Sequence, residues 1–532
     1  GYNAMGGAIG TEAVNDCVII GSGAAAATLT STASGLVAIG MGAGAIVTSG
    51  AKNVLIGFGC APELLTGEKN TAVGYQAMFN SDGDEDSNTC IGYYAGAGID
   101  NANSNTIIGD RACGSGVMTG DGQTIVGQIA AQNLTSGALN TMVGSTCGSA
   151  LTTGTQNVFM GAYAGDAMAD DESYNVAIGV NAMGAVDQGS HASADADYNV
   201  AIGQNALLGG DFGSSDLNLI NNVAVGNGAM DGTGAYTATH NVFVGNDAGG
   251  GSWSAEANSN VGIGSAAMDG TNAGASNNVA IGYASLSANL GVDADYNIAI
   301  GSGAMGAATT AYYNVCIGKD TGTAMAAAVP SCVIIGHEAG DAINHADAGG
   351  TVAIGRSAGG GITSGQRSTM IGYQAGLLLS TGDSNTGVGY QALVSLTSGA
   401  YNTAFGDDAL GDEDTGGQST AVGVEALGRQ SSDATEDADN TAVGMTAGKF
   451  NILGQNNTSI GSRAMRGVVN NDHSNNTAVG KDALFAITTG GTNVAVGTNA
   501  MLANTEGSNN VAVGHNAGAH ITEGLGNVCI GV

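Results

Sequence analysis

The chain has 532 residues, a length that would ordinarily mean several domains of about 150 residues each. Glycine accounts for 93 residues and proline for 2, and only 11 % are charged, so large side chains are too scarce for a thick globular core. The 11 basic and 45 acidic residues give a net charge of −34, which disfavours nucleic acid and anionic membrane surfaces as partners. Because no apolar run reaches 18 residues, we also expect no membrane insertion.

One motif recurs from end to end: Asn, then Thr or Val, a small residue, Val or Ile, Gly, two variable residues and Ala. Clear copies are built on three sets of residues: Asn70, Gly74 and Ala77; Asn199, Gly203 and Ala206; and Asn493, Gly497 and Ala500. The 30 motif glycines are never closer than 17 residues. A fixed minimum with variable additions predicts one coil per repeat, with loop insertions that are longest at residues 180–222.

The pattern around the glycine predicts a short β-strand. β-branched residues stand three and one positions before it, with a mostly small residue between them, which is the period-two alternation of a strand. The Asn column predicts an amide ladder between coils, and the glycine predicts a corner with positive φ or close backbone approach. The fold class is therefore all-β: a parallel β-solenoid or β-roll of about 30 coils, forming one continuous array over residues 1–532.

Assembly and length follow from the same repeat. Each coil offers little apolar area to bury, so we expect the small-residue face to let other chains approach closely, most economically three. If each repeat is one coil, the array should measure roughly 140 Å at one strand spacing per interval. We also expect both ends of the chain to be cut inside a repeat, since Gly1 and Gly531 are both motif glycines.

The repeats resemble those of two known groups. The NTAVGYQAL-type form, carried most closely by residues 70–78, 368–376 and 385–393, is similar to the shafts of bacteriophage tail fibres. The Asn-x-Ala-Ile-Gly core also resembles the β-roll head of trimeric autotransporter adhesins, although its period is longer than theirs. Both resemblances imply a homotrimer located on the virion or outside the cell. The first also implies other fibre or baseplate proteins as partners.

Acidic residues cluster before the Asn of the longer repeats. The alternate carboxylates Asp82, Asp84 and Asp86 have the spacing of a calcium loop, because such side chains can converge on one hard cation. The loop lacks the glycine and the glutamate that complete such a motif. The alternative is a solvated, self-repelling rim that opposes aggregation. Calcium is the one cofactor that the sequence suggests.

Other residues are weighed in the same way. Seven of the eight cysteines fit small or ladder positions of the repeat, which predicts buried free thiols rather than a zinc site. Trp253 in a loop, and Asp195 and Asp197 in the longest insertion, are possible receptor contacts, for example to a cell-surface glycan. The alternative for Trp253 is a cover over an open cavity. We find no catalytic motif, so we expect no enzyme.

Two functions remain open on these grounds. The first is the structural shaft of a phage tail fibre, a rigid spacer that presents a receptor-binding tip. The second is a bacterial surface adhesin that binds host or matrix through its loops. Threonines three residues before the glycine also raise the possibility of ice binding, but their exchange with valine favours a packed position.

Overall fold

The computed structural model describes residues 2–7, 14–187, 195–210, 218–326, 328–432, 437–468 and 471–532. The regular elements of these residues are strands, apart from two 3-10 helices, η1 (Ser31–Ala33) and η2 (Ala346–Ala348). The chain divides into two compact units, Gly1–Gly274 and Ala275–Val532, and each unit is a parallel β-solenoid. Part of the predicted insertion at 180–222, namely residues 188–194 and 211–217, lies outside the described residues.

The first unit contains a long sheet and a short one. The strands of its long sheet are β1 (Val18–Ile20), β2 (Val37–Ile39), β3 (Val54–Ile56), β4 (Thr71–Val73), β5 (Thr89–Ile91), β6 (Thr106–Ile108), β7 (Thr124–Val126), β8 (Thr141–Val143), β9 (Val158–Met160), β10 (Val176–Ile178), β11 (Val200–Ile202), β13 (Val223–Val225), β15 (Val242–Val244) and β17 (Val261–Ile263). The longer repeats add a second sheet of β12 (Leu219–Ile220), β14 (Ala238–Thr239) and β16 (Ala257–Asn258). Longer insertions thus extend the coil sideways without interrupting the long sheet.

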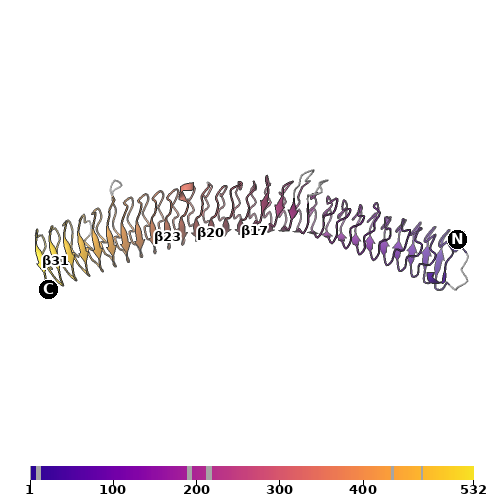
Figure 1. Ribbon diagram of the computed structural model, residues 1–532, viewed down its shortest axis with the longest axis horizontal. Helices are drawn as coiled ribbons and strands as arrows, with labels where there is room; N and C mark the ends of the chain where they lie inside the picture. The colour runs from indigo at the N-terminus through magenta and orange to yellow at the C-terminus, as the bar shows by residue number, and fades with distance from the viewer. Residues whose placement is uncertain are drawn as a thin grey trace. The chain divides into compact units, whose positions relative to one another are not determined.

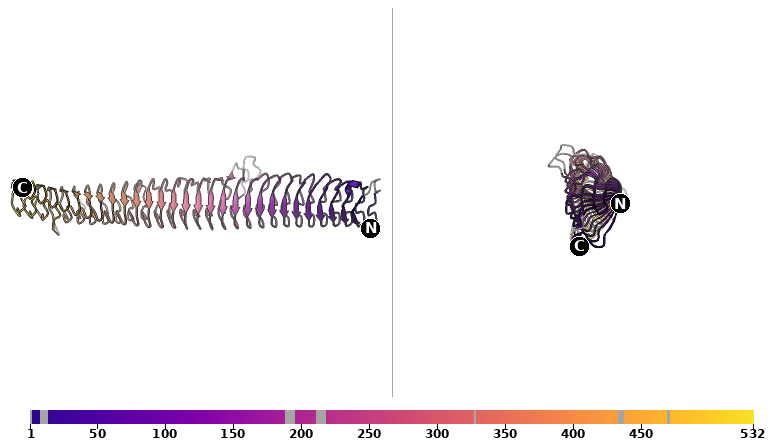
Figure 2. Two further views of the ribbon diagram at one scale, coloured as in Figure 1. Left: turned by 90° about the horizontal axis from the view of Figure 1, so that it is seen from below. Right: turned by 90° about the vertical axis from the view of Figure 1, so that its right-hand side faces the viewer.

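The second unit repeats the same strand. Its strands are β18 (Val279–Ile281), β19 (Ile298–Ile300), β20 (Val315–Ile317), β21 (Val333–Ile335), β22 (Val352–Ile354), β23 (Thr369–Ile371), β24 (Thr386–Val388), β25 (Thr403–Phe405), β26 (Thr420–Val422), β27 (Thr441–Val443), β28 (Thr458–Ile460), β29 (Thr477–Val479), β30 (Val494–Val496), β31 (Val511–Val513) and β32 (Val528–Ile530). Figures 1 and 2 show these strands as successive arrows lying side by side within each unit.

Neighbouring strands pair in parallel and without slippage. In β4 and β5, for example, Thr71 lies opposite Thr89 and Val73 opposite Ile91, and the same register holds from β23 to β24. The predicted parallel β-solenoid is therefore confirmed, with about 27 turns and a repeat of about 17–18 residues.

The small-residue face of the sheet points into the coil, whereas we expected it to lie open to another chain. In β4 the middle residue, Ala72, is fully buried, whereas Thr71 and Val73 are half-buried on the outside. Most other strands of the long sheets follow this pattern. The expectation that the small-residue face lies open to another chain is therefore wrong. Small residues fill the narrow interior of the chain's own coil, and the β-branched residues face outward.

The interior is thin, and at several positions a large residue enters it beside a neighbouring glycine. Phe159 and Phe243 occupy the middle position of their strands and are fully buried. A Cβ on Gly165 would lie 2.7 Å from the Phe159 ring, and one on Gly262 would lie 2.3 Å from the Phe243 ring. The glycines make room for the rings, which keeps the interior close-packed.

The motif glycine forms a corner that only glycine can occupy. Gly74 has φ of +150°, and a Cβ there would lie 2.0 Å from the carbonyl oxygen of Gly92 in the next coil. Gly92 stands in the same relation to Gly109, at 2.4 Å. Positive φ and close backbone approach, which the sequence offered as alternative reasons, therefore act together here.

The Asn column forms a buried ladder along each unit. The backbone N–H of Asn70 donates to Asn53 Oδ1 at 2.8 Å, and its side-chain amide donates to the same oxygen at 3.2 Å and to the carbonyl of Glu85 at 2.6 Å. In the second unit Asn493 makes the equivalent bonds to Asn476 Oδ1. Each amide thus satisfies backbone groups that the turn before the strand would otherwise leave buried and unpaired.

Candidate functional site

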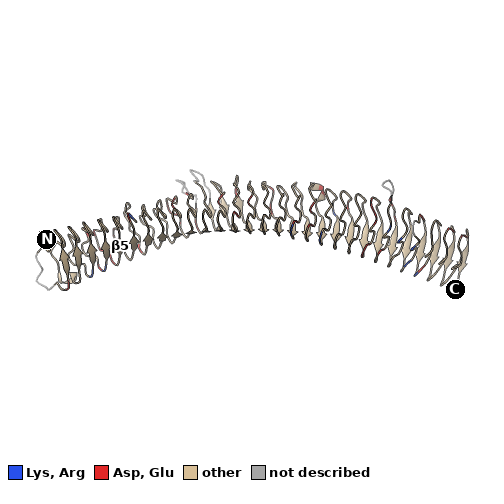
Figure 3. Ribbon diagram, turned by 180° about the vertical axis from the view of Figure 1, so that it is seen from behind, with Lys and Arg blue, Asp and Glu red and all other residues tan. Residues whose placement is uncertain are grey.

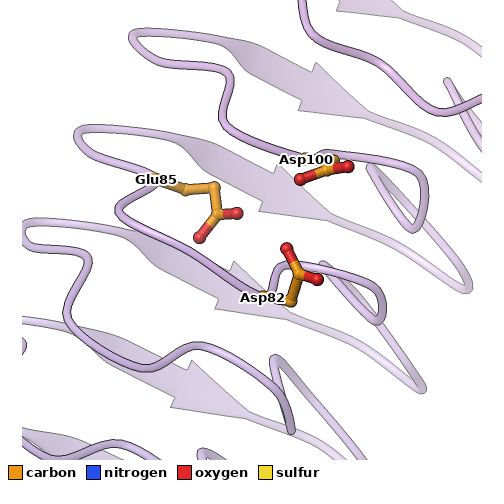
Figure 4. A group of neighbouring side chains, drawn as sticks. All are labelled: Asp82, Glu85 and Asp100. Atoms are coloured by element: carbon orange, nitrogen blue, oxygen red, sulfur yellow. The ribbon is translucent and has the colours of Figure 1, made fainter.

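The acidic loop of the first unit holds the closest group of carboxylates that the described residues bring together. The group consists of Asp82, Glu85 and Asp100, whose carboxylate oxygens lie within 4.8 Å of one another. Figure 4 shows Asp82 and Glu85 on one coil and Asp100 on the next, with their carboxylates pointing toward a common space. Asp82 is exposed, Glu85 is buried and Asp100 is half-buried.

This grouping differs from the predicted trio of Asp82, Asp84 and Asp86. The Asp84 carboxylate accepts a hydrogen bond from the Thr66 hydroxyl. Asp86 Oδ1 accepts one from the backbone N–H of Glu68 at 2.6 Å. Both side chains therefore tie their loop to the preceding coil, and of the predicted trio only Asp82 takes part in the group.

The predicted trio left out Glu85 and Asp100, although the sequence held a signal for each. Glu85 occupies the position three before the ladder Asn88, which neighbouring coils fill with Gly67 and Ala102. That inward register could have identified it. Asp100 lies in the following coil, eight residues after Gly92, just as Asp82 lies eight residues after Gly74, so aligning the coils on their glycines could have paired the two.

The electrostatics of the group favour the protonated form of Asp100. The buried Glu85 carboxylate accepts hydrogen bonds from the backbone N–H groups of Gly83, at 3.1 Å, and of Asn101, at 3.2 Å. Burial raises the pKa of Asp100, and the charge of Asp82 and a hydrogen bond with it raise that pKa further. Asp100 therefore holds a proton more readily than an isolated carboxylate would.

The same three oxygens are the ligand type that calcium takes, but Ca²⁺ takes about six to eight of them. Three carboxylates meet only part of that requirement. Two of the three are also engaged already, Glu85 by backbone N–H groups and Asp100 by Asp82. Calcium binding at this loop stays a prediction.

The possible receptor contacts lie in different environments. Trp253 is only 5 % exposed, its indole N–H donates to the carbonyl of Gly249 at 3.2 Å, and its ring meets Phe243 edge-on at 6.4 Å. It covers the widened interior and presents no open ring face to a sugar. Asp195 is exposed, whereas Asp197 is half-buried and caps the backbone N–H of Ser173 at 2.6 Å.

The cysteines are free thiols, and most are buried. Cys60, Cys90, Cys113, Cys147, Cys316 and Cys332 are buried, and Cys17 and Cys529 are half-buried. Burial raises the pKa of Cys60 and of Cys113 to about 12, so neither thiol ionises near neutral pH. Thiols of this kind serve as small apolar side chains and react slowly.

Stacked aromatic side chains are a feature that the repeat analysis missed. In the first unit Phe58, Tyr75 and Tyr93 stack along the coils with centroids 5.2 and 5.3 Å apart. Each directly follows a motif glycine, so the register alone would have aligned them. In the second unit Tyr296 and Tyr313 form a similar pair at 5.0 Å, in the column just before the ladder Asn.

His473 is a buried titratable group in the second unit. It is fully buried, neither ring nitrogen has a hydrogen-bond partner, and burial lowers its pKa to about 4. An unfolded chain would bind a proton on this ring near its ordinary pKa of 6.5, whereas the folded chain would not. The part of the unfolding free energy that depends on this ring is therefore fully present above pH 6.5, and it is lost as the pH falls toward 4.

The replacement His473→Ala is expected to remove this acid sensitivity. Alanine fills the same position in other coils, for example at Ala102. Between pH 7.5 and 5 the natural chain should lose about 2 kcal/mol more unfolding free energy than the variant, as measured by urea denaturation at both pH values. An equal loss in both proteins would show that the ring does not stay neutral in the folded state.

Charge is distributed away from the strands. None of the described strands contains a charged residue, and Figure 3 shows the strand arrows free of acidic and basic colours.

No helix among the described residues combines the length and apolar character needed to cross a bilayer. No protein-family model matches the chain, and no curated protein matches it.

Proposed function

We propose that the chain is a structural fibre segment, the shaft of a phage tail fibre, which acts as a spacer that presents a receptor-binding tip. The observation that carries this proposal is the unbroken register of the coils within each unit. Strand pairing and the amide ladder run from coil to coil along the stack. Each repeat therefore adds length and stiffness in one direction, as a spacer requires. A non-enzymatic role and a location on the virion or outside the cell belong to the same proposal.

The outer sheet face supports assembly into a homotrimer. We use this name for the first and third side chains of each three-residue strand. In the second unit Val443 and Ile460 are 37 % and 40 % exposed on this face. The face is uncharged in a chain whose net charge is −34, so copies can meet there with the least like-charge repulsion.

The area of this face suits a stable contact. A strand of three residues covers about 50 Å² of sheet face, which is its length multiplied by the spacing between neighbouring strands. Over β18–β32 this amounts to roughly 700 Å² per copy, close to the roughly 800 Å² per partner of a standard interface. The outer sheet faces of three chains, turned toward a common axis, would bury the half-exposed Val, Ile and Thr side chains.

Molecular mass and charge substitutions test this assembly. We expect the full chain to have three times the 51.5 kDa monomer mass, measured by light scattering after size-exclusion chromatography. Replacing Ile91, Ile108 and Val126 with lysine should give monomers, because it places three charges per chain on the outer sheet face. The fold should remain, since these side chains do not enter the interior.

The matched control places the same charges elsewhere. Ser87→Lys, Ser104→Lys and Leu139→Lys alter the column just before the ladder Asn, where Lys52 and Lys69 already stand with φ of 60°. This control should keep the mass of the natural chain. A natural chain that is monomeric at micromolar concentration, or a control that dissociates equally, would contradict the homotrimer.

A bacterial surface adhesin that binds through its loops remains the second candidate. The exposed aromatic side chains of the second unit favour it, because rings at a surface loop are suited to ligand contact.

A further inference from the structure

An open cleft of about 390 Å³ lies on the second unit, between consecutive coils. It is lined by Asp293, Asp295, Tyr296, Tyr312, Tyr313 and Ala328. The cleft is separate from the outer sheet face, and its residues belong to the turns that lead into the strands β19, β20 and β21.

The repeat itself positions the aromatic wall. Tyr296 and Tyr313 each stand just before a ladder Asn with φ of 57°, which turns both side chains outward, one above the other. Their rings stack with centroids 5.0 Å apart at an angle of 10°. Tyr312 meets Tyr313 at 77°, with centroids 5.7 Å apart, and so forms a second wall nearly perpendicular to the first.

The tyrosine stack stops at the following coil. Ser331 continues the column, with φ of 57° and its backbone N–H bonded to the carbonyl of Tyr312 at 3.1 Å. Serine is too small to cover a tyrosine ring, and the exposed Ala328 on the same coil adds little bulk. Tyr313, which is 56 % exposed, therefore keeps accessible ring surface on the side of the cleft.

Two carboxylates complete the lining. Asp293 is exposed, and Asp295 is half-buried and held by the backbone N–H of Ser276, which donates to its Oδ1 at 2.6 Å. Carboxylate oxygens accept hydrogen bonds from hydroxyl groups. No basic side chain belongs to the lining, so the cleft disfavours an anionic ligand.

We propose that this cleft binds a neutral hexose unit of a glycan. The C–H face of the sugar ring would pack on Tyr313 and against Tyr312, where apolar hydrogens meet the negative face of the aromatic rings. Asp293 and Asp295 would accept hydrogen bonds from its hydroxyl groups. A few polar groups set beside an aromatic wall are the usual composition of a small-ligand site. The site goes beyond the spacer role and does not depend on it.

Binding by the full chain tests the site directly. The probes are tetrasaccharides of glucose, galactose, mannose and N-acetylglucosamine, measured by saturation-transfer NMR and calorimetry. We expect at least one of them to bind, and Tyr313→Ser, which copies the residue of the next coil, to weaken that binding at least about tenfold. Asp293→Asn should weaken it by less, because the amide still offers one acceptor oxygen.

The control variant is Tyr401→Ser. Tyr401 stands in the same column, is 64 % exposed and lies outside the cleft, so its replacement should leave the affinity unchanged. Failure of all four probes to bind at 10 mM, or an equal loss on Tyr401→Ser, would overturn the proposal. Binding of tetramethylammonium in place of any sugar would also overturn it, since two perpendicular rings with carboxylates could instead hold an organic cation. None of these results bears on the oligomeric mass.

Discussion

Replacing Gly74 with alanine is expected to destabilise the chain by at least about 4 kcal/mol, among the largest effects of a single substitution. The new Cβ would lie 2.0 Å from the carbonyl oxygen of Gly92, far inside van der Waals contact, and this atom belongs to backbone that is itself fixed by the next coil. Alanine would also have to adopt φ of +150°. Thermal and urea unfolding of the full chain measure the loss.

The matched control for this substitution is Gly35→Ala. Gly35 also has a positive φ, of +78°, but a Cβ there meets its nearest neighbour, Lys52, at an ordinary 3.7 Å. Gly35→Ala should therefore lower the free energy of unfolding only by the cost of a left-handed backbone conformation, about 1–2 kcal/mol. If the two substitutions cost the same, close coil-to-coil approach is not what selects glycine at the corner.

Replacing Asn88 with alanine is expected to cost about 3 kcal/mol, because it leaves several buried groups unpaired. Asn88 Nδ2 donates to the carbonyl of Ala102 at 2.8 Å. Its Oδ1 accepts both the backbone N–H and the side-chain amide of Asn105, each at 3.0 Å. We expect the urea midpoint to fall and the amide of Asn105 to lose protection from hydrogen exchange.

Serine provides the graded control at this position. Ser368 already stands in the Asn column of the second unit, where its hydroxyl accepts the backbone N–H of Asn385 at 3.3 Å. Asn88→Ser should therefore keep one acceptor for Asn105 and cost about half as much as alanine. A serine variant as damaged as the alanine variant would show that the ladder acts by packing and not by hydrogen bonding.

The repeat could be predicted from the sequence because every coil obeys the same local rules. Gly74 and Asn70 each perform a task that few other residue types can perform, so their columns mark the coil directly. Which face of the strand points into the coil could not be predicted in the same way. Alternation shows that Thr71 and Val73 share one face and Ala72 takes the other, but it does not say which face is inside. We expected the small residues on the open face because they would let another chain approach closely, whereas the narrow coil takes mostly small residues into its own interior.

The candidate sites were harder to predict because stacking creates them. Asp82 and Asp100 each stand eight residues after a motif glycine, and they meet only when successive coils are superposed. Tyr296 and Tyr313 also share a column, so both pairs were within reach of an alignment of the repeats. Trp253 shows the opposite difficulty: a loop position suggested exposure, but the widened interior beside Phe243 takes up the ring.

The central claim is that each repeat adds one coil and therefore one strand spacing of length. Copies of residues 373–423, which carry three successive 17-residue repeats ending at Gly389, Gly406 and Gly423, can be inserted after Gly423 in register. Small-angle X-ray scattering of chains with one, two and four added copies is the direct measurement. Each copy should lengthen the particle by about 14 Å and leave its cross-sectional radius unchanged. A cross-section that grows with each copy while the length stays constant would contradict the account.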